Sequence, residues 1–317
     1  MLEDEGLAYW MRWQVAVCAI IAALPSVIAV TVILKIEKQP LWAACLWAPC
    51  WRKVSPFWLL AYRAVAFLFM AWLLGQMVLF RGAFNFFFYT QWTFALVIIY
   101  FAIGTVASAH GCWICSKHAF FKNEEASCLL RGDLEQCHDS DLALAPEEER
   151  NGYILSNYGG DLMHEERAGL WGHFMQITYQ TSAGAVMLTD VIFWCLLVPF
   201  MSSVHFRVTL MMACLHSLNA IFLIVDSILN SLPFPLFGMA FFVLWSCIYV
   251  AFQWILHACG FKWWPYPFMD LSTSWAPLWY FTMVLMHIPC FGIYYLLARA
   301  KNSCFSRLFP IAYRRLF

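Results

Sequence analysis

Four ionisable side chains interrupt the long apolar runs of this sequence, namely those of Arg63, Asp190, His216 and Asp226. An ionisable group within a bilayer is costly, so each is a functional-site hypothesis by default. His216, Asn219 and Asp226 recur at offsets of three and seven, within about a 100° sector of one helix face. Such a polar stripe should face a bundle interior or a cavity. There it could hydrogen-bond neighbouring helices, take part in catalysis or line a transport path.

A possible nucleophile lies in a different apolar run, in the segment Tyr89-Thr90-Gln91-Trp92-Thr93. The Thr90 hydroxyl can attack a carbonyl if a base stands beside it, although a threonine in a membrane helix usually hydrogen-bonds its own backbone. We expect Thr90 roughly 6–9 Å and His216 roughly 13 Å below the start of their helices, which run in the same direction. The two side chains could therefore meet in the outer half of a bundle.

A third group of residues has types that can bind metal. It comprises Cys112, Cys115, His118, Cys128, Cys137 and His138. Closed zinc sites usually need two well-spaced pairs, and the spacing here is irregular, which favours incidental or palmitoylated cysteines. Haem between His216 and His287 is a weaker alternative. We therefore expect neither a metal nor a cofactor.

The composition indicates the class of protein that carries these residues. Of the 317 residues, 63% are hydrophobic and only 12% are charged, about half the charge of an ordinary soluble domain. The 19 basic residues balance the 19 acidic ones, which excludes a typical nucleic-acid binder, and the apolar content excludes a disordered chain. We predict an all-α, polytopic transmembrane helix bundle.

Apolar runs of about 20 residues, the length needed to cross a bilayer, predict seven spans. They are expected at 13–34, 57–79, 86–109, 181–200, 208–229, 234–257 and 276–298. Six spans are the alternative, because the first is the least constrained. Residues 168–180 are interpreted as an amphipathic helix lying on the membrane surface before the fourth span.

The loops define the predicted organisation and orientation. Residues 1–110 hold three spans with a cytosolic loop at 35–56, and 111–170 form an acidic, largely disordered cytosolic loop. Residues 171–298 hold four spans, and 299–317 form a basic tail. Lysines and arginines concentrate in these loops and the tail, so the N-terminus should be outside or lumenal and the C-terminus cytosolic. The expected location is the endoplasmic reticulum or the plasma membrane.

Three short segments resemble a known family. The runs Phe88–Phe94 and Leu215–Ala220, the latter followed by Asp226, and the segment Trp264-Pro265-Tyr266-Pro267 resemble plant rolling-stone-like transmembrane proteins, over about residues 40–301. These proteins are in turn distantly similar, in short motifs, to the androgen-induced-gene family of intramembrane hydrolases. That resemblance implies a threonine and a histidine acting together on fatty acid esters of hydroxy fatty acids, at the positions of Thr90 and His216.

Three functional hypotheses follow. In the first, Thr90 attacks a lipid ester that enters from the bilayer, His216 takes its proton, and Asn219 orients the histidine or binds the oxyanion, with Asp190 and Asp226 in supporting positions. In the second, the protein is not catalytic and its acidic loop recruits cytosolic proteins. In the third and weakest, Asp190 and Asp226 line a transport path.

Overall fold

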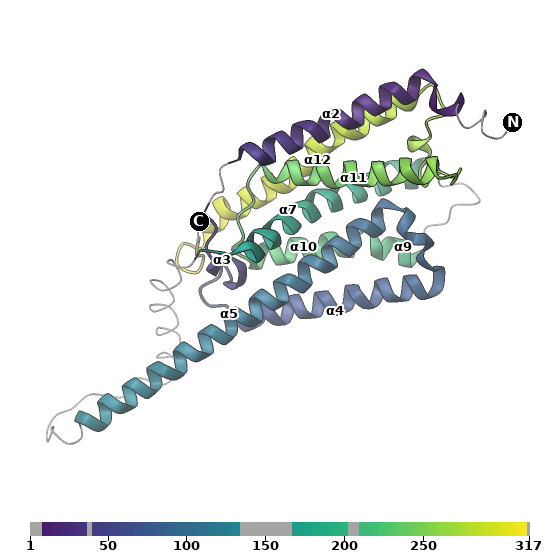
Figure 1. Cartoon of the computed structure of the whole chain (residues 1–317). Helices are drawn as coiled ribbons and strands as arrows, with labels where there is room; N and C mark the ends of the chain where they lie inside the picture. Colours follow the sequence, from purple (N-terminus) through teal and green to yellow (C-terminus); the bar gives the residue numbers. More distant parts are fainter. Residues whose placement is uncertain (1–7, 37–39, 134–166, 202–208, 316–317) are drawn as a thin grey trace.

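The computed structural model describes residues 8–36, 40–133, 167–201 and 209–315, and these form a bundle of helices without strands (Figure 1). The long helices are α2 (Trp13–Lys35), α4 (Pro56–Arg81), α5 (Tyr89–Asp133), α7 (Leu170–Val191), α10 (Leu218–Leu229), α11 (Gly238–Ala258) and α12 (Ala276–Leu308). A π-helical segment (Ile192–Leu197) and α8 (Val198–Met201) continue α7, and α9 (Leu210–Leu215) precedes α10. The predicted all-α class is confirmed.

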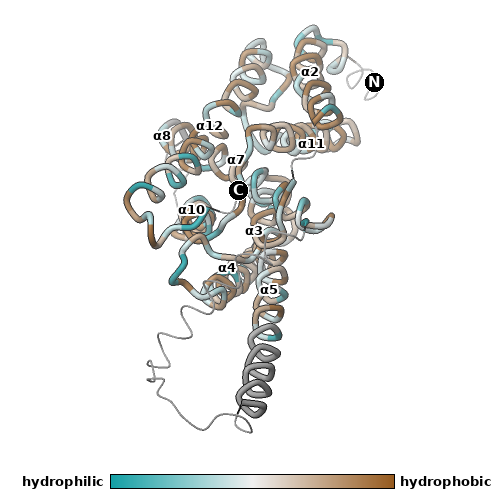
Figure 2. The backbone as a smooth tube through the Cα atoms, turned by 90° about the vertical axis from the view of Figure 1, so that its left-hand side faces the viewer, coloured by the Kyte–Doolittle hydropathy of each residue, from teal (hydrophilic) through white to brown (hydrophobic). Residues whose placement is uncertain are grey.

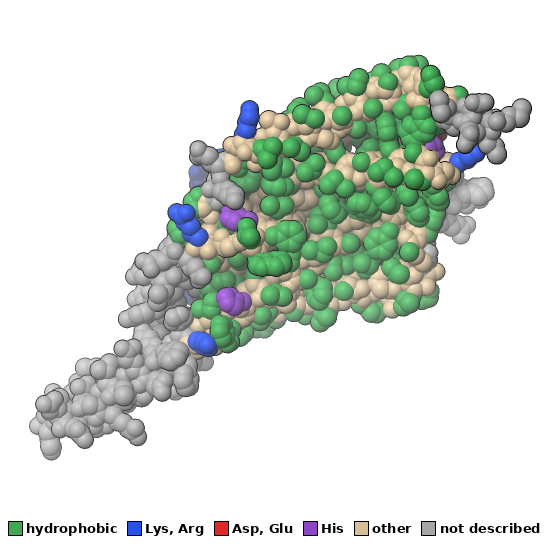
Figure 3. Space-filling model, viewed as in Figure 1, with side chains coloured by type: hydrophobic (Ala, Val, Ile, Leu, Met, Phe, Trp, Pro, Cys, Tyr) green, Lys and Arg blue, Asp and Glu red, His purple; other side chains and the backbone are tan. Residues whose placement is uncertain are grey.

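Seven segments of the described chain are long and apolar enough to cross a membrane, which is the expected number. Large apolar side chains point outward along them, as Trp58, Leu68 and Trp72 do on α4. Figure 2 shows that the helices are mainly hydrophobic, and Figure 3 shows an apolar flank with lysines and arginines at its two ends. The chain is therefore a multi-pass integral membrane protein.

The helix α7 lies at the centre of the bundle. It packs against α5 on one side and against α11 and α12 on the other, while α4 packs on α5 and α2 packs on α11 and α12. The N-terminus of α2 and the C-terminus of α12 lie at opposite ends of the bundle (Figure 1), in keeping with an odd number of spans. The outer helix α2 is the least buried of the seven, and α7 is the most buried.

Short segments close the end of the bundle that holds the C-terminus of α12. The short helix α3 (Ala44–Trp47) is buried there. Isolated bridges join Trp42 to Arg167, Pro49 to Asn230 and Trp51 to Tyr313. The predicted loop at 35–56 and the predicted tail are therefore packed against the bundle over part of their length.

Two expectations about the middle of the chain are corrected. Residues 168–180 do not form a surface helix, because α7 begins at Leu170 and buries Gln176, Thr178 and Gln180 inside the bundle. The side-chain N–H groups of Gln176 and Gln180 donate to the Pro233 carbonyl oxygen, and the Thr178 hydroxyl donates to backbone carbonyl oxygens of α7. The helix α5 continues to Asp133, so the first part of the stretch 111–170 is helical, while residues 134–166 lie outside the described part.

Candidate functional site

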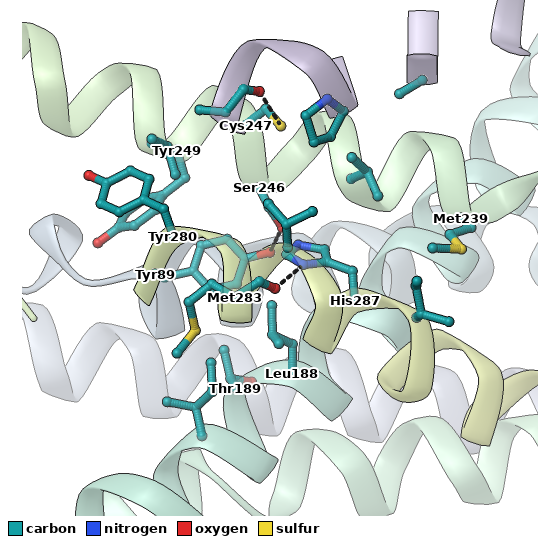
Figure 4. Close-up of a pocket in the computed structure, with 18 of the residues that line it drawn as sticks. Tyr89, Leu188, Thr189, Met239, Ser246, Cys247, Tyr249, Tyr280, Met283 and His287 are labelled. Atoms are coloured by element: carbon teal, nitrogen blue, oxygen red, sulfur yellow. Dashed lines mark hydrogen bonds between the residues drawn. The ribbon is translucent and has the colours of Figure 1, made fainter. Parts of the chain in front are cut away.

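A cavity of about 630 Å³ lies between α2, α11 and α12 and reaches the C-terminal part of α7 and the start of α5. Its lining is almost entirely apolar, with Pro25 and Ile28 of α2 on one side and Val243 and Val284 of α11 and α12 on another. Figure 4 shows side chains of these helices converging on it. Since the lining comes from spanning helices, the cavity lies within the membrane region.

Thr90 lines this cavity as the second residue of α5. A short 3₁₀ helix, Ala83–Phe87, precedes α5 and sets the point at which it starts. The Tyr266 hydroxyl accepts a hydrogen bond from the backbone N–H of Tyr89 (3.1 Å) and interacts with Thr90. Burial raises the pKa of Tyr266, so its hydroxyl keeps its hydrogen next to Thr90.

His216 lines the same cavity from a break in the fifth span. The helix α9 ends at Leu215 and α10 begins at Leu218, so His216 and Ser217 lie between them with non-helical backbone angles. The Trp194 indole N–H donates to the His216 carbonyl oxygen (3.2 Å), which partly compensates for the interrupted helix. Trp194 belongs to the π-helical segment that follows α7, a kind of irregularity often found at functional sites.

The His216 ring lies beside two side chains, Asp190 near the end of α7 and Phe193 in the π-helical segment that follows it. The Phe193 ring stacks on it, with ring centroids 3.8 Å apart and planes 4° apart. Asp190 Oδ1 lies 3.7 Å from His216 Nδ1, slightly beyond hydrogen-bond length, and neither atom has a hydrogen-bond partner in the described chain. Because Nδ1 is directed at Asp190, Nε2 is the nitrogen available to the cavity.

Thr90 and His216 are equally far along the chain from a contact between α5 and α10. The Tyr100 hydroxyl of α5 donates to the carboxylate of Asp226 in α10, which ties these two positions together. Thr90 and His216 each lie ten residues earlier in the chain. In α5 that separation corresponds to about 15 Å of helix, whereas on the other side it includes the break at His216 and Ser217 that precedes α10. The expectation that both residues belong to one half of the bundle agrees with this register.

The structure divides the predicted polar stripe instead of keeping it on one face. Asp226 forms a fully buried ion pair with Arg63, Nε to Oδ1 at 2.9 Å, away from the cavity. Asn219 is also buried outside the cavity lining, with Oδ1 accepting the Ala220 N–H (2.8 Å) and Nδ2 without a partner in the described chain. The break at His216 causes this division, because it ends the helical repeat that placed the three side chains together.

Sequence reasoning gave no catalytic role to three further polar side chains of the cavity, of which it had considered only His287, as a weaker haem alternative. The hydroxyls of Tyr89 and Ser246 lie 2.7 Å apart, and the His287 Nδ1 lies 2.8 Å from the Met283 carbonyl oxygen (Figure 4). The Phe242 ring, one turn before Ser246, packs on the His287 ring with centroids 4.6 Å apart. A histidine in the middle of an apolar run was the available signal for this group.

The cysteine-rich motif lies apart from the cavity. Cys112 and Cys115 are free thiols on α5, and the described residues contain no group of three side chains that could hold a metal ion. The side chains of His118, Cys128, Cys137 and His138 lie outside the described part of the chain.

The cavity therefore combines the Thr90 hydroxyl, the His216 imidazole and the Tyr266 hydroxyl in otherwise apolar surroundings. A hydroxyl, a neutral base and a neutral donor are the groups needed for nucleophilic attack on a carbonyl. Comparisons with models of protein families, with curated proteins and with solved structures found no match to this chain.

Proposed function

We propose that this protein is an intramembrane hydrolase of fatty acid esters, with Thr90 as nucleophile and His216 as base. The observation that carries the proposal is that one apolar cavity, formed by spanning helices, is lined by both side chains. The resemblance of the segments around Thr90 and His216 to the androgen-induced-gene hydrolases adds support. Membrane lipids are then the substrates, and they enter from the bilayer rather than from water.

The proposed reaction has two steps. His216 Nε2 takes the proton of the Thr90 hydroxyl as its oxygen attacks the ester carbonyl, and the imidazolium returns that proton to the departing alcohol. Water then attacks the acyl-threonine, giving its proton to His216, and the threonine oxygen leaves with that proton, so the free acid is released and the enzyme is restored. Asp190, 3.7 Å from Nδ1, stabilises the imidazolium.

The oxyanion of this reaction needs a hydrogen-bond donor close to Thr90. Asn219, which sequence reasoning offered for this role, does not line the cavity. The Tyr266 hydroxyl does line it and interacts with Thr90. We therefore assign oxyanion stabilisation to Tyr266, for which the loss of one donor typically costs 10²–10³ in kcat.

The proposal is tested with the purified protein and a broad panel of long-chain fatty esters. We expect Thr90→Ala and His216→Ala each to lower the rate by a factor of about 10²–10⁴. Thr93→Ala is the matched control, because Thr93 lies in the same motif and is buried but does not line the cavity. An inactive wild type, or a fully active Thr90→Ala variant, would overturn the proposal and favour the non-catalytic alternative, in which acidic residues of 111–170 recruit cytosolic partners.

We also propose that the N-terminus is outside or lumenal and the C-terminus cytosolic, in the endoplasmic reticulum or the plasma membrane. The excess of basic residues in the loops after the first and third spans and in the tail supports this orientation. A glycosylation acceptor inserted near residue 268 should be modified and one near residue 140 should not. The reverse pattern would invert the orientation.

A further inference from the structure

The wall of the cavity carries polar groups near Thr90 but no charged side chain. Among the described residues, the lining contains no aspartate, glutamate, lysine or arginine, and Asp190, which lies beside His216, is not part of it. A phosphate, an ammonium or a carboxylate group placed there would lose its hydration without gaining a partner, which is very costly in apolar surroundings. A neutral ester loses far less. The cavity therefore suits a lipid without a charged group.

The size of the cavity limits the substrate to one long chain. Its volume of about 630 Å³ is that of a site for a single ligand of drug size, and it is too small for two or three long acyl chains. The end that holds Thr90 is also lined by Tyr266, Met269 and Tyr280, which are all buried. The Tyr280 hydroxyl donates to the Met269 carbonyl oxygen (3.2 Å), which holds this wall together. This end is therefore closed, and only a small group fits beyond the ester.

The rest of the cavity runs along α2 and α11, and two contacts show that these helices are antiparallel. The Trp10 ring, just before α2, packs on the Trp254 ring near the end of α11, with centroids 5.9 Å apart. Further along α2, the Ala22 carbonyl oxygen accepts from the Cys247 thiol of α11 (3.8 Å, Figure 4). Residue numbers therefore rise along α2 while they fall along α11.

Two alanines lie opposite each other in this part of the cavity. Ala29 and Ala240 are each seven residues, about two helical turns, beyond the contact between Ala22 and Cys247. Both alanines are buried and both line the cavity, which continues past them to Val32. Because an alanine side chain ends at Cβ, these two positions leave a passage between α2 and α11 that a larger side chain would fill.

The helix α11 also gives the distance from Thr90 to these alanines. The ring of Tyr89, the neighbour of Thr90, packs on the Tyr249 ring of α11 with centroids 5.0 Å apart. Ala240 lies nine residues before Tyr249, which corresponds to ~13 Å of helix. An extended chain advances roughly 1.2 Å per bond, so about eleven carbons of an acyl chain reach from the level of Thr90 to the alanines.

We infer that the substrate is an uncharged ester of a small alcohol with one long acyl chain, which passes between Ala29 and Ala240. The two alanines determine specificity, because they admit chains longer than about eleven carbons. The inference rests on the proposed hydrolase for the position of the ester at Thr90. The passage itself rests only on the contacts between α2 and α11.

Binding of methyl decanoate and methyl stearate to the purified full-length Thr90→Ala protein tests the passage without turnover. In this background, Ala29→Leu and Ala240→Leu should each weaken the binding of methyl stearate about tenfold, because the added side chain overpacks the passage. Methyl decanoate ends before the passage, so its binding should persist and show that the variants fold. The matched controls are Ala23→Leu and Ala251→Leu, which lie on the same helices, exposed and outside the lining. Unchanged binding of methyl stearate in both variants, or equal loss of both esters in both, would overturn the passage.

Two further probes with the same stearoyl chain test the class of substrate. We expect 1-stearoyl-lysophosphatidylcholine to bind at least about tenfold more weakly than methyl stearate, because its charged headgroup has no partner at the closed end. Tristearin, which has three chains, should not compete with methyl stearate. Equal binding of either probe would overturn the inferred class. If the two leucine variants discriminate by chain length although the wild type hydrolyses no ester, the passage stands and the hydrolase alone is refuted.

Discussion

Two buried polar regions of this bundle differ in how completely their groups are paired. Around Asp226, the Arg63 guanidinium donates to both carboxylate oxygens, to the Ser108 hydroxyl and to the Leu46 carbonyl oxygen. Tyr100 and Asn230 also donate to the same carboxylate. Beside the cavity, by contrast, Asp190 Oδ1 and His216 Nδ1 have no hydrogen-bond partner in the described chain.

The difference separates a structural role from a functional one. The sequence marked Arg63, Asp190, His216 and Asp226 alike as costly intramembrane groups, yet only the pair Arg63 and Asp226 is compensated within the protein. The Asp190 carboxylate and the His216 imidazole, by contrast, lie 3.7 Å apart without a hydrogen bond between them. The contrast also argues against a transport path through Asp190 and Asp226, since the second is locked in an ion pair.

The largest effect is expected from a substitution in the fully paired region around Asp226. Asp226→Ala should lower the free energy of unfolding by about 3–5 kcal/mol, because it leaves the Arg63 charge buried without a partner. Asp190→Ala should cost less than about 1 kcal/mol, since its Oδ1 makes no hydrogen bond to lose. Unfolding of both variants in detergent micelles measures the difference. Equal losses of stability would contradict the division into two kinds of region.

An intermediate effect is expected where α7 packs on α11 beside the cavity. A Cβ at Gly184 would lie 2.6 Å from the Phe242 ring, so Gly184→Ala should destabilise the protein by about 1–3 kcal/mol. The matched control is Gly292→Ala, where the added Cβ meets nothing within 4 Å. Comparison of the thermal midpoints of the two variants provides the measurement.

The smallest effect concerns the support of His216. Trp194→Phe removes the indole hydrogen bond to the His216 carbonyl oxygen, which should cost about 0.5–1.5 kcal/mol of stability. Because this hydrogen bond holds the backbone at the break in the fifth span, we expect kcat for ester hydrolysis to fall while KM changes little. Steady-state kinetics beside an unfolding curve would separate the two readouts. A variant with normal kcat would show that the Trp194 hydrogen bond is not needed to position the imidazole.

The spans were predictable because the residues that face lipid are apolar throughout, so hydropathy finds them. The start of α7 was missed for the opposite reason. Gln176, Thr178 and Gln180 lower its hydropathy, and only the packed bundle explains how their polar groups can be buried. Hydropathy reports what faces lipid, and α7 faces protein.

The candidate site was only partly predictable. Thr90 and His216 were named from residue type and motif, and both line the cavity. The stripe was expected to face the bundle interior or a cavity, and all three of its side chains are buried. The break at His216 has no proline or glycine to announce it, so the change of direction between His216 and the other two side chains could not be predicted. The proximity of Asp190 to His216 depends on which helices pack together, and that is not encoded in local spacing.

The closed end of the bundle has a consequence for the order of biosynthesis. The backbone of residues 50–52 is paired with residues much later in the chain, since the Arg52 N–H donates to the Ala312 carbonyl oxygen and the Arg314 N–H to that of Cys50. The ribosome makes this loop before six of the seven spans and its partners after them. Until the last span has been inserted, water must satisfy these groups. The first interhelical loop to be made is therefore among the last parts of the molecule to be completed.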